Sequence, residues 1–585
     1  MRFALLFVLL WFSADALGQT GGIRTYCNPL DIDYKYNFEQ KNQGISYRSG
    51  ADPVIIRHKD AYYLFGTIAG GYWRSTDLVK WDFIEPSRWP FRDVVAPAAL
   101  SVGDTLYLLP SWDRQGALLY TTAPETGKLE FYNRLLPDLP PVVPYNTGAW
   151  DPALFYDEET RSWFNYFGSS NVYPIFGVEL DPSNGLAHMG EPVPLIYLHP
   201  EDHGWERFGQ DHTDPRDPFI EGAWMTKHEG RYYLQYAAPG TEYNVYANGT
   251  YVGDDPLGPF EYAPYNPVSY KPGGFVTGAG HGNTFEDEYG NFWNTGTPWV
   301  AVNWNFERRI AMFPAGFDTD GQMFASTRFG DFPHYAPTGR WESPDELFTG
   351  WMLLSYRKPA TASSVRDTFA VERVTDENPR TFWVAETKSP NEWLTVDLEE
   401  PHEIRAIQVN FTDYQAGLYA SDSTVYTQFR LKVSEDGETW RTVADLTGER
   451  RDRPNAYVEL PEPVRARYVR YEHVYVAAAH LAISDLRVFG NGDGGPPATP
   501  TGFTVRRDTD PRNAFVTWEP VEGAVGYNVR WGIAPDKLYL TYQVFADAPT
   551  ELEIRALNRG VGYHFAVEAF NENGVSALSE VVSVE

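Results

Sequence analysis

Five segments between residues 25 and 337 of this 585-residue chain share one pattern: an apolar strand, a polar turn and an aromatic strand. They are KDAYYLFGT, GDTLYLLPS, TRSWFNYFGS, EGRYYLQYAA and YGNFWNTGT. Repeats of this length without helical periodicity predict radial repetition, here a five-bladed β-propeller. A long β-sandwich or a solenoid is the alternative. In a propeller the innermost strands line one axial cavity, so residues at the heads of different blades converge.

Three of the repeated units begin with an acid: Asp52 in SGADPVI, Asp151 in GAWDPAL and Glu221 in PFIEGAW. Singly, each acid is typical of a turn or a cap. Jointly, at matching positions, they predict a shared site. Hydrolysis of a glycosidic bond needs one carboxylic acid and a second carboxylate acting as base or nucleophile. A third acid can keep the first protonated by like-charge repulsion. We expect Asp52 to act through water and Glu221 to reach the leaving group.

The charge and the chain start restrict the class of protein. A formal net charge of −31 argues against nucleic acid or an anionic membrane surface as a partner. Residues 1–18 resemble a signal peptide, with Arg2 before an apolar run that is too short to span a bilayer. We therefore expect a monomeric protein exported by a bacterium to the periplasm or the medium, without membrane insertion. Cys27 is the only cysteine, so no intramolecular disulfide forms, and we expect it to be buried.

Composition changes mark two further domains. A joining segment, 338–356, leads to residues 357–490, where LTVDL and RAIQVNF alternate like half-buried antiparallel strands. The Gly/Pro-rich stretch 491–500 is a linker. Residues 501–585 predict an immunoglobulin-like sandwich in which Tyr563 occupies the position of a tyrosine corner. The expected chain is all-β, a five-bladed propeller followed by two β-sandwiches.

The order and spacing of the three acids, with their flanking residues, resemble the signature of glycoside hydrolase family 43, a family of five-bladed propellers. The resemblance covers about residues 25–335. It implies Asp52 as general base, Asp151 as the residue that modulates and positions the acid, Glu221 as general acid, and inversion at the anomeric carbon. Two positions depart from the family pattern: Ala223, where proline is usual, and Ala98, where an acid often follows the proline.

The resemblance extends to further site residues. His281 matches a family histidine near the propeller axis that often supports a bound cation, frequently calcium; a hydrogen-bonded structural histidine is the alternative. Arg308 resembles an arginine of the last blade that reaches the catalytic pocket, although the adjacent Arg309 leaves this open by one position. The segment 205–214, WERFGQDHTD, is either a loop at the pocket rim or a solvated surface loop. Aromatic residues near the acids are candidates to stack on a sugar, with blade packing as the alternative: Trp73, Trp112, Trp150, Phe167 and Trp224.

The middle domain resembles a discoidin or factor 5/8 type C domain, as in carbohydrate-binding modules of the family 32 type. This resemblance implies a structural calcium ion held at Asp376 with help from Asp485, and leaves open whether the domain binds glycan or packs against the propeller. The last domain resembles fibronectin type III, for which a spacer or scaffold role is expected. The residues that carry the discoidin resemblance are Asp376, Asn378, Trp393, Asp397 and Asp485.

Together these features predict an exported, inverting glycosidase that removes terminal furanose residues from plant or algal polysaccharides. An α-L-arabinofuranosidase is the first choice; a galactofuranosidase, an exo-β-1,3-galactanase and a β-xylosidase are alternatives within the family. A non-catalytic glycan-binding protein and an adhesion scaffold are alternatives from other classes, but neither explains the three acids. The expected partner is an oligo- or polysaccharide, and the chemistry itself requires no metal. Inversion predicts that the two reacting carboxyl groups lie roughly 6.5–9.5 Å apart.

Overall fold

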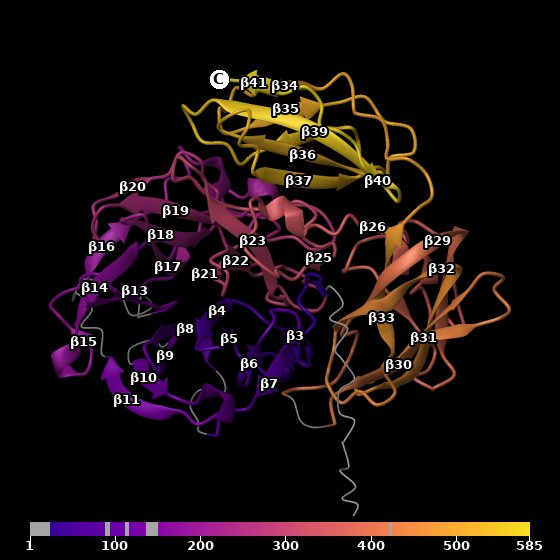
Figure 1. Cartoon of the computed structure of the whole chain (residues 1–585), viewed down its shortest axis with the longest axis horizontal. Coiled ribbons are helices and arrows are strands. Elements are labelled where there is room, and N and C mark those ends of the chain that lie inside the picture. Colours follow the sequence, from indigo (N-terminus) through magenta and orange to yellow (C-terminus); the bar gives the residue numbers. More distant parts are fainter. Residues whose placement is uncertain (1–23, 88–93, 112–115, 136–149, 421–423) are drawn as a thin grey trace, which may run out of the picture.

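The computed structural model describes residues 24–87, 94–111, 116–135, 150–420 and 424–585 (Figure 1). Within these ranges the regular structure consists of β-strands and short 3-10 helices. No helix in the described part of the chain is long and apolar enough to cross a membrane. The predicted signal peptide and Trp112 lie outside the described residues.

Five sheets, each built from strands consecutive in sequence, stand around a common centre (Figure 1). The first two blades are β4 (Val54–His58), β5 (Ala61–Phe65), β6 (Tyr72–Ser75) and β7 (Asp82–Ile84), then β8 (Val95–Val102), β9 (Thr105–Ser111), β10 (Gly116–Thr121) and β11 (Glu130–Leu135). The third is β12 (Ala153–Asp157), β13 (Ser162–Phe167) and β14 (Ile175–Asp181), with β15 (Ala187–His188) and β16 (Val193–Ile196) both paired to β14. The last two are β17 (Glu221–His228), β18 (Arg231–Ala238), β19 (Ala247–Gly253) and β20 (Phe260–Tyr262), then β21 (Thr284–Glu286), β22 (Phe292–Gly296), β23 (Ala311–Phe317) and β24 (Met323–Ala325).

The predicted five-bladed propeller is thus confirmed. All strand pairs within the blades are antiparallel, as expected where tight turns join consecutive strands. The ring closes outside the blades: β1 (Thr25–Tyr26) pairs with β25 (His334–Tyr335) and joins the start of the propeller to its end. A second short ribbon, β2 (Lys35–Tyr36) with β3 (Arg48–Ser49), leads into the first blade.

The middle domain is one eight-stranded sheet that folds over an aliphatic core. Leu394 and Val396 on one stretch of β29, and Ile407 and Val409 on another, are fully buried. The predicted half-buried alternation is not seen in RAIQVNF, because the alternate residues Ala406, Gln408 and Asn410 are buried as well. The joining segment contributes β26, which pairs with β33, so it belongs physically to this domain. The strands are β26 (Met352–Leu353), β27 (Ala360–Ala362), β28 (Trp383–Val384), β29 (Trp393–Phe411), β30 (Thr427–Ser434), β31 (Arg441–Asp445), β32 (Asn455–Val476) and β33 (Ala482–Asn491).

The last domain is a two-sheet sandwich. The hydroxyl of Tyr563 accepts the backbone N–H of Asn558 at 3.0 Å, the bond that defines a tyrosine corner. One sheet is β34 (Thr504–Arg507), β35 (Ala514–Thr517) and β38 (Glu551–Ile554). The other is β36 (Gly526–Gly532), β37 (Leu540–Phe545), β39 (Tyr563–Asn571), β40 (Gly574–Val575) and β41 (Val582–Val584).

This sandwich rests on the propeller (Figure 1). Residues His203 and Asn558 form a β-bridge between the two domains. Arg328 pairs with Glu568 at 2.7 Å, and the rings of Phe324 and Tyr539 stack 4.0 Å apart. The contact combines backbone pairing, a salt bridge and aromatic stacking, so the domain is a fixed part of the molecule.

Candidate active site

The three acids occupy equivalent places in their blades. Asp52 precedes β4 and Asp151 precedes β12, and both have left-handed backbone conformations, with φ of 52° and 51°. Aspartate tolerates this region better than most residues. Glu221 begins β17, and the register shifts between Glu221 and Trp224, where Gly222 has φ of 64°. The bulge turns the start of this strand, as bulges near active sites commonly do.

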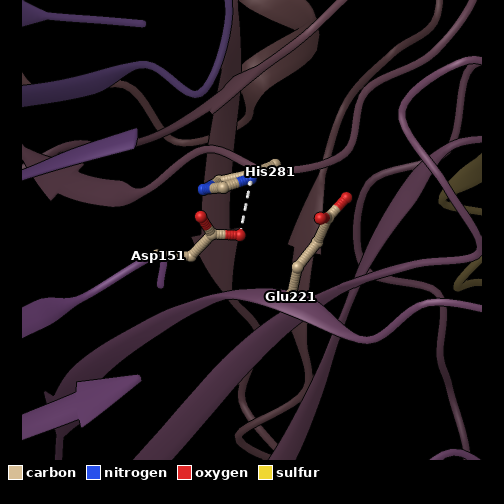
Figure 2. Close-up of side chains that lie close together, drawn as sticks. All are labelled: Asp151, Glu221 and His281. Atoms are coloured by element: carbon tan, nitrogen blue, oxygen red, sulfur yellow. Dashed lines mark ion pairs between the residues drawn. The ribbon is translucent and has the colours of Figure 1, made fainter. Parts of the chain in front are cut away.

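The acids meet at His281, which lies between blades 4 and 5. Its Nδ1 is 3.2 Å from Asp52 Oδ1 and 3.8 Å from Asp151 Oδ2. Oxygens of Asp151 and Glu221 and a ring nitrogen of His281 all lie within 4.8 Å of one another, and Figure 2 shows the three side chains facing the same space. Asp52 and Asp151 are only 5% and 7% exposed. Residues distant in sequence are therefore brought to one centre; their separate catalytic roles stay a prediction.

The surroundings assign different protonation states to the two aspartates. Burial opposes ionisation of Asp52, but the charges of Arg308 and His281 and a hydrogen bond from Thr67 hold its pKa below its usual range. Burial raises the pKa of Asp151 to about 8, with the charges of Glu221 and Asp52 adding to the effect and His281 opposing it. At neutral pH Asp52 is thus a carboxylate and Asp151 holds a proton. Pairs of carboxyl groups with separated pKa values are typical of acid–base sites.

The acids around His281 favour its charged form. Burial lowers the pKa of its imidazole, yet the neighbouring acids, Asp52 first and then Asp151 and Glu221, outweigh burial and raise the pKa above the usual value. When protonated, the imidazole compensates the negative charge at the centre of the site.

Glu221 is oriented by two hydroxyl groups that the sequence analysis did not identify. Tyr246 donates to Glu221 Oε1 at 2.5 Å, and Ser169 donates to Oε2 at 3.0 Å. Both oxygens of the carboxyl group are therefore fixed before any substrate arrives.

Ser169, but not Tyr246, carries a signal in the sequence, because four of the five repeated units end in Ser or Thr. Thr67 follows β5 and bonds to Asp52, and Ser169 follows β13 and bonds to Glu221. Ser111, at the end of β9, accepts the backbone N–H of Asp151 at 2.9 Å. Thr297, after β22, accepts that of Asp52 at 2.9 Å. The hydroxyl at the end of the second strand thus supports an acid on its own or a neighbouring blade.

Arg308 is the arginine that reaches the site. Its Nη1 lies 3.5 Å from Asp52 Oδ1 and donates to Thr241 Oγ1 at 2.8 Å. Arg309 points the other way and donates to Asn455 of the middle domain at 3.1 Å. The ambiguity of one position in the sequence is resolved by the geometry in favour of Arg308.

Three family models match consecutive parts of the chain. They are described as Glycosyl hydrolases family 43, over residues 43–322, F5/8 type C domain, over residues 359–480, and Fibronectin type III domain, over residues 498–585. Residues 43–322 form a glycoside hydrolase family 43 domain. The protein is therefore a glycoside hydrolase of an inverting family.

Several solved structures are similar to the chain at low sequence identity. One titled "Glycoside hydrolase" is 16% identical, with 75% of this chain and 97% of that chain covered and a TM-score of 0.45. A thermostable family-43 glycoside hydrolase is 20% identical over 54% of this chain and 100% of its own, with a TM-score of 0.42. "Bacteroides ovatus Xyloglucan PUL GH43B" is 14% identical over 96% and 92%, with a TM-score of 0.41. Among curated proteins, none matches the sequence.

Most aromatic residues predicted to bind sugar pack inside the family 43 domain instead. Trp73 is 1% exposed in a core shared by blades 1 and 5, and Phe167 is 0% exposed between Phe176 and His188. The indole of Trp224 donates to the carbonyl of Thr284. These three are packing residues, because their rings fill the spaces within and between blades. Trp150 is half-buried beside Asp151 and stays a candidate.

Much of segment 205–214 is packed between domains, although Asp211 and Thr213 are exposed. Trp205 is 0% exposed, and Arg207 donates to the carbonyl of Arg555 and to Asn513 in the fibronectin domain, both at 2.6 Å. On its other side Gln210 donates to the carbonyl of Glu242 at 3.1 Å. The segment links the last domain to the blade that carries Glu221.

Asp151, Glu221 and His281 also come close enough to share a metal ion. Calcium prefers an all-oxygen shell of six to eight ligands, whereas this cluster offers two carboxylates and one nitrogen. An imidazolium that pairs with Asp52 repels a cation, so metal binding here requires His281 to be neutral or to act through water.

Gly222 is predicted to be indispensable for the position of His281. A Cβ on this residue would lie 2.9 Å from Cγ and Cδ2 of the imidazole, and the positive φ costs a side chain about 1–2 kcal/mol. We expect Gly222→Ala to lower kcat on the order of 10-fold to 10²-fold because the imidazole must move. Gly230→Ala is the matched control: its φ is also positive, but nothing lies within 4 Å of its Cβ. Equal loss of kcat in both variants would contradict the steric explanation.

Asp151→Asn is predicted to change how stability depends on pH. Because the folded pKa of about 8 lies above the ordinary value of 3.8, folded Asp151 retains a proton that the unfolded chain releases. This group therefore makes the wild type less stable as pH rises from about 4 to 8. Asparagine does not ionise, so the Tm advantage of the variant should grow from pH 5 to pH 8 in thermal denaturation. Parallel Tm curves for the two proteins would disprove the shift.

Proposed function

We propose that the enzyme is exported and releases terminal furanose residues, α-L-arabinofuranosyl first, with inversion at the anomeric carbon. The observation that carries this proposal is the convergence of Asp52, Asp151 and Glu221 on one buried centre in which the first acid is ionised and the second protonated. An inverting hydrolase needs one carboxyl group that takes a proton and another that supplies one. The ionised Asp52 suits the first task, and Glu221, at the same centre, is assigned the second.

In the proposed reaction Asp52 accepts a proton from the water that attacks the anomeric carbon. Glu221 donates a proton to the leaving oxygen as the glycosidic bond breaks. Asp151 lies beside Glu221 and positions it, and its pKa of about 8 leaves Asp151 itself protonated at neutral pH. The proton gained by Asp52 and the proton lost by Glu221 are then exchanged with solvent.

Two features support action on a chain end. Asp52 and Asp151 are almost fully buried, and a terminal sugar reaches buried acids more readily than the interior of a polymer does. Phe306 is 40% exposed and lies beside Arg308, whose guanidinium is 5.4 Å from the ring centre. An exposed aromatic face next to the pocket suits a flat sugar ring. Galactofuranose, galactose and xylose are the alternative terminal sugars.

A panel of aryl α-L-arabinofuranosides, β-D-galactofuranosides, β-D-galactosides and β-D-xylosides tests the sugar. We expect the highest kcat/KM on the arabinofuranoside, and a higher value on any other member would replace the proposed substrate. Proton NMR of the first product formed tests the stereochemistry. If the product initially has the same anomeric configuration as the substrate, the inverting mechanism is wrong.

Export belongs to the same proposal, since residues 1–18 have the composition of a signal peptide. N-terminal sequencing of the protein secreted by a bacterial host should show a start after this segment. Retention of residues 1–18 in the cell-associated protein would contradict export.

We also propose a calcium ion in the middle domain. Asp485 is fully buried, neither of its carboxylate oxygens has a hydrogen-bond partner, and burial with the charges of Glu377 and Asp376 raises its pKa well above the usual range. Such a carboxylate fits a cation, which would neutralise it together with Asp376. Calcium is expected to raise Tm in wild type but not in Asp485→Asn. The weaker possibility of calcium beside His281 would show as a calcium-dependent kcat in both proteins.

A further inference from the structure

Asp52 and Arg308, which form an ion pair, belong to two chain segments, 48–52 and 306–309, that are hydrogen-bonded to each other. The backbone N–H of Gly50 donates to the carbonyl of Arg308 at 3.1 Å. The hydroxyl of Ser49 donates to the carbonyl of Phe306 at 2.9 Å. The segments 48–52 and 306–309 therefore move together, and any group that holds one of them also holds the catalytic pair.

The first segment is anchored in the middle domain by Arg48. Its Nε donates to Asp413 Oδ1 at 2.8 Å, and its Nη1 donates to Asp452 Oδ1 at 2.8 Å. The backbone N–H of Arg48 donates to Asp413 Oδ2 at 2.8 Å as well. Arg48 is 3% exposed and Asp413 is 0% exposed, so the contact is shielded from water. Buried ion pairs with several hydrogen bonds have little freedom to shift.

The second segment is anchored by the neighbours of Arg308 on both sides. Arg309 donates to Asn455 Oδ1 at 3.1 Å and to the carbonyl of Arg48 at 2.8 Å, which ties the two segments to each other. The carboxylate of Glu307, fully buried, accepts the backbone N–H groups of Val302 at 2.9 Å and Asn303 at 2.7 Å. Burial and the charge of Asp413 raise the pKa of Glu307 to about 7. The carboxyl group of Glu307 is therefore close enough to the middle domain to interact with its charges.

We propose that the F5/8 type C domain is a positioning part of the active site: through Asp413 and Asn455 it fixes Arg48 and Arg309, and so holds Arg308 against Asp52. The proposal rests on the function proposed above only in taking Asp52 as a reacting carboxylate. It gives the middle domain a task in turnover that does not depend on glycan binding.

The chemistry of this interface favours positioning over simple adhesion. Apolar side chains of similar volume would hold two domains together at least as well, because burying charged groups costs desolvation energy. Here the buried groups are instead two arginines, two aspartates and one glutamate, all connected to segments that carry the catalytic pair. Glu307 and Arg309 face one side of the chain while Arg308 faces the pocket, as expected of consecutive residues in an extended segment.

A double-mutant cycle on kcat/KM tests the proposal in the full-length enzyme. Asn455→Ala removes the acceptor of Arg309 and is expected to lower kcat/KM on an aryl glycoside by about tenfold or more. In an Arg308→Ala background the same change should cost less than about twofold, since the group to be positioned is already absent. An equal loss in both backgrounds would overturn the proposal.

The same cycle is repeated with Asp413→Asn, which retains the shape of the side chain. The proposal expects a loss of kcat/KM that shrinks in the Arg308→Ala background, and an equal loss in both backgrounds would overturn it. The matched control is Asp31→Asn, which removes another ion pair between the domains, Asp31 with Arg453 at 3.0 Å, that does not touch either catalytic segment. We expect it to lower Tm and to leave kcat/KM within about twofold of wild type. A loss as large as that of Asn455→Ala would also overturn the proposal.

The proposed function and the positioning role of the middle domain can be disproved separately. If Arg308→Ala has the kcat/KM of wild type, the role of the Asp52 and Arg308 pair in the proposed function is wrong. If Arg308→Ala is impaired but the loss from Asn455→Ala is undiminished in its presence, only the positioning role is wrong.

Discussion

Asp52→Asn is expected to lower kcat by about 10²–10⁴-fold, the range that a general base contributes. The amide retains the shape of the side chain and the hydrogen bond from Thr67, but it cannot accept a proton from water. Because Arg308 and His281 keep wild-type Asp52 ionised, the loss should persist across the neutral pH range. Steady-state kinetics on an aryl arabinofuranoside measures it.

The control for Asp52 is Asp60→Asn at the opposite end of the same strand. Asp60 lies in the exposed turn between β4 and β5 and should be replaceable without loss of kcat. If Asp52→Asn retains more than about a tenth of wild-type kcat, a different group is the base.

Glu221→Gln is expected to have an effect that depends on the leaving group. An amide cannot protonate the departing oxygen, so oligosaccharides, whose leaving groups are poor, should lose about 10²–10⁴-fold in kcat. Dinitrophenyl glycosides leave without protonation and should lose far less. Ser169 and Tyr246 can still hold the amide in place, so the contrast reports proton transfer rather than misfolding.

The matched control is Glu229→Gln, in the exposed turn at the other end of the strand that begins at Glu221. It should behave as wild type on both substrates. Equal losses of Glu221→Gln on the oligosaccharide and on the dinitrophenyl glycoside would exclude Glu221 as the general acid.

The fold and the place of the acids could be predicted because both depend on local pattern. Each blade is a set of consecutive strands joined by short turns, so its sequence unit is complete and visible. An acid at the head of such a unit has its position set by the symmetry of the ring. Asp52 and Asp151 even share the same left-handed backbone conformation.

The environment of individual side chains could not be predicted in this way. Trp73, Phe167 and Trp224 lie near the acids in sequence, as sugar-binding residues would. In the structure, however, their rings fill the space within and between blades. Whether an aromatic residue faces the axis or the next blade depends on strand twist and on distant packing partners. The hydroxyl residues that end the repeats were visible in the sequence, yet only the ring geometry shows which acid each one serves.

The contacts between domains also could not be predicted from the sequence. Asp413 and Asn455 follow no motif, and Arg48 is an ordinary residue of a short ribbon. Their meeting depends on how two independently folded surfaces fit, which neither surface specifies alone. The same holds for Arg207, whose partners lie some 300 residues further along the chain in the fibronectin domain.

The locked contact between the F5/8 type C domain and the propeller has a consequence for polymeric substrates. A module on a flexible tether samples every sugar within its reach, whereas this one is clamped by Arg48 and Arg309 and by Arg487, which donates to the carbonyl of Asp331 at 2.7 Å. A polymer gripped by that module would reach the acids at a single spacing. The enzyme would then remove branches at a constant distance from the point where the module is attached, and the product would be periodic.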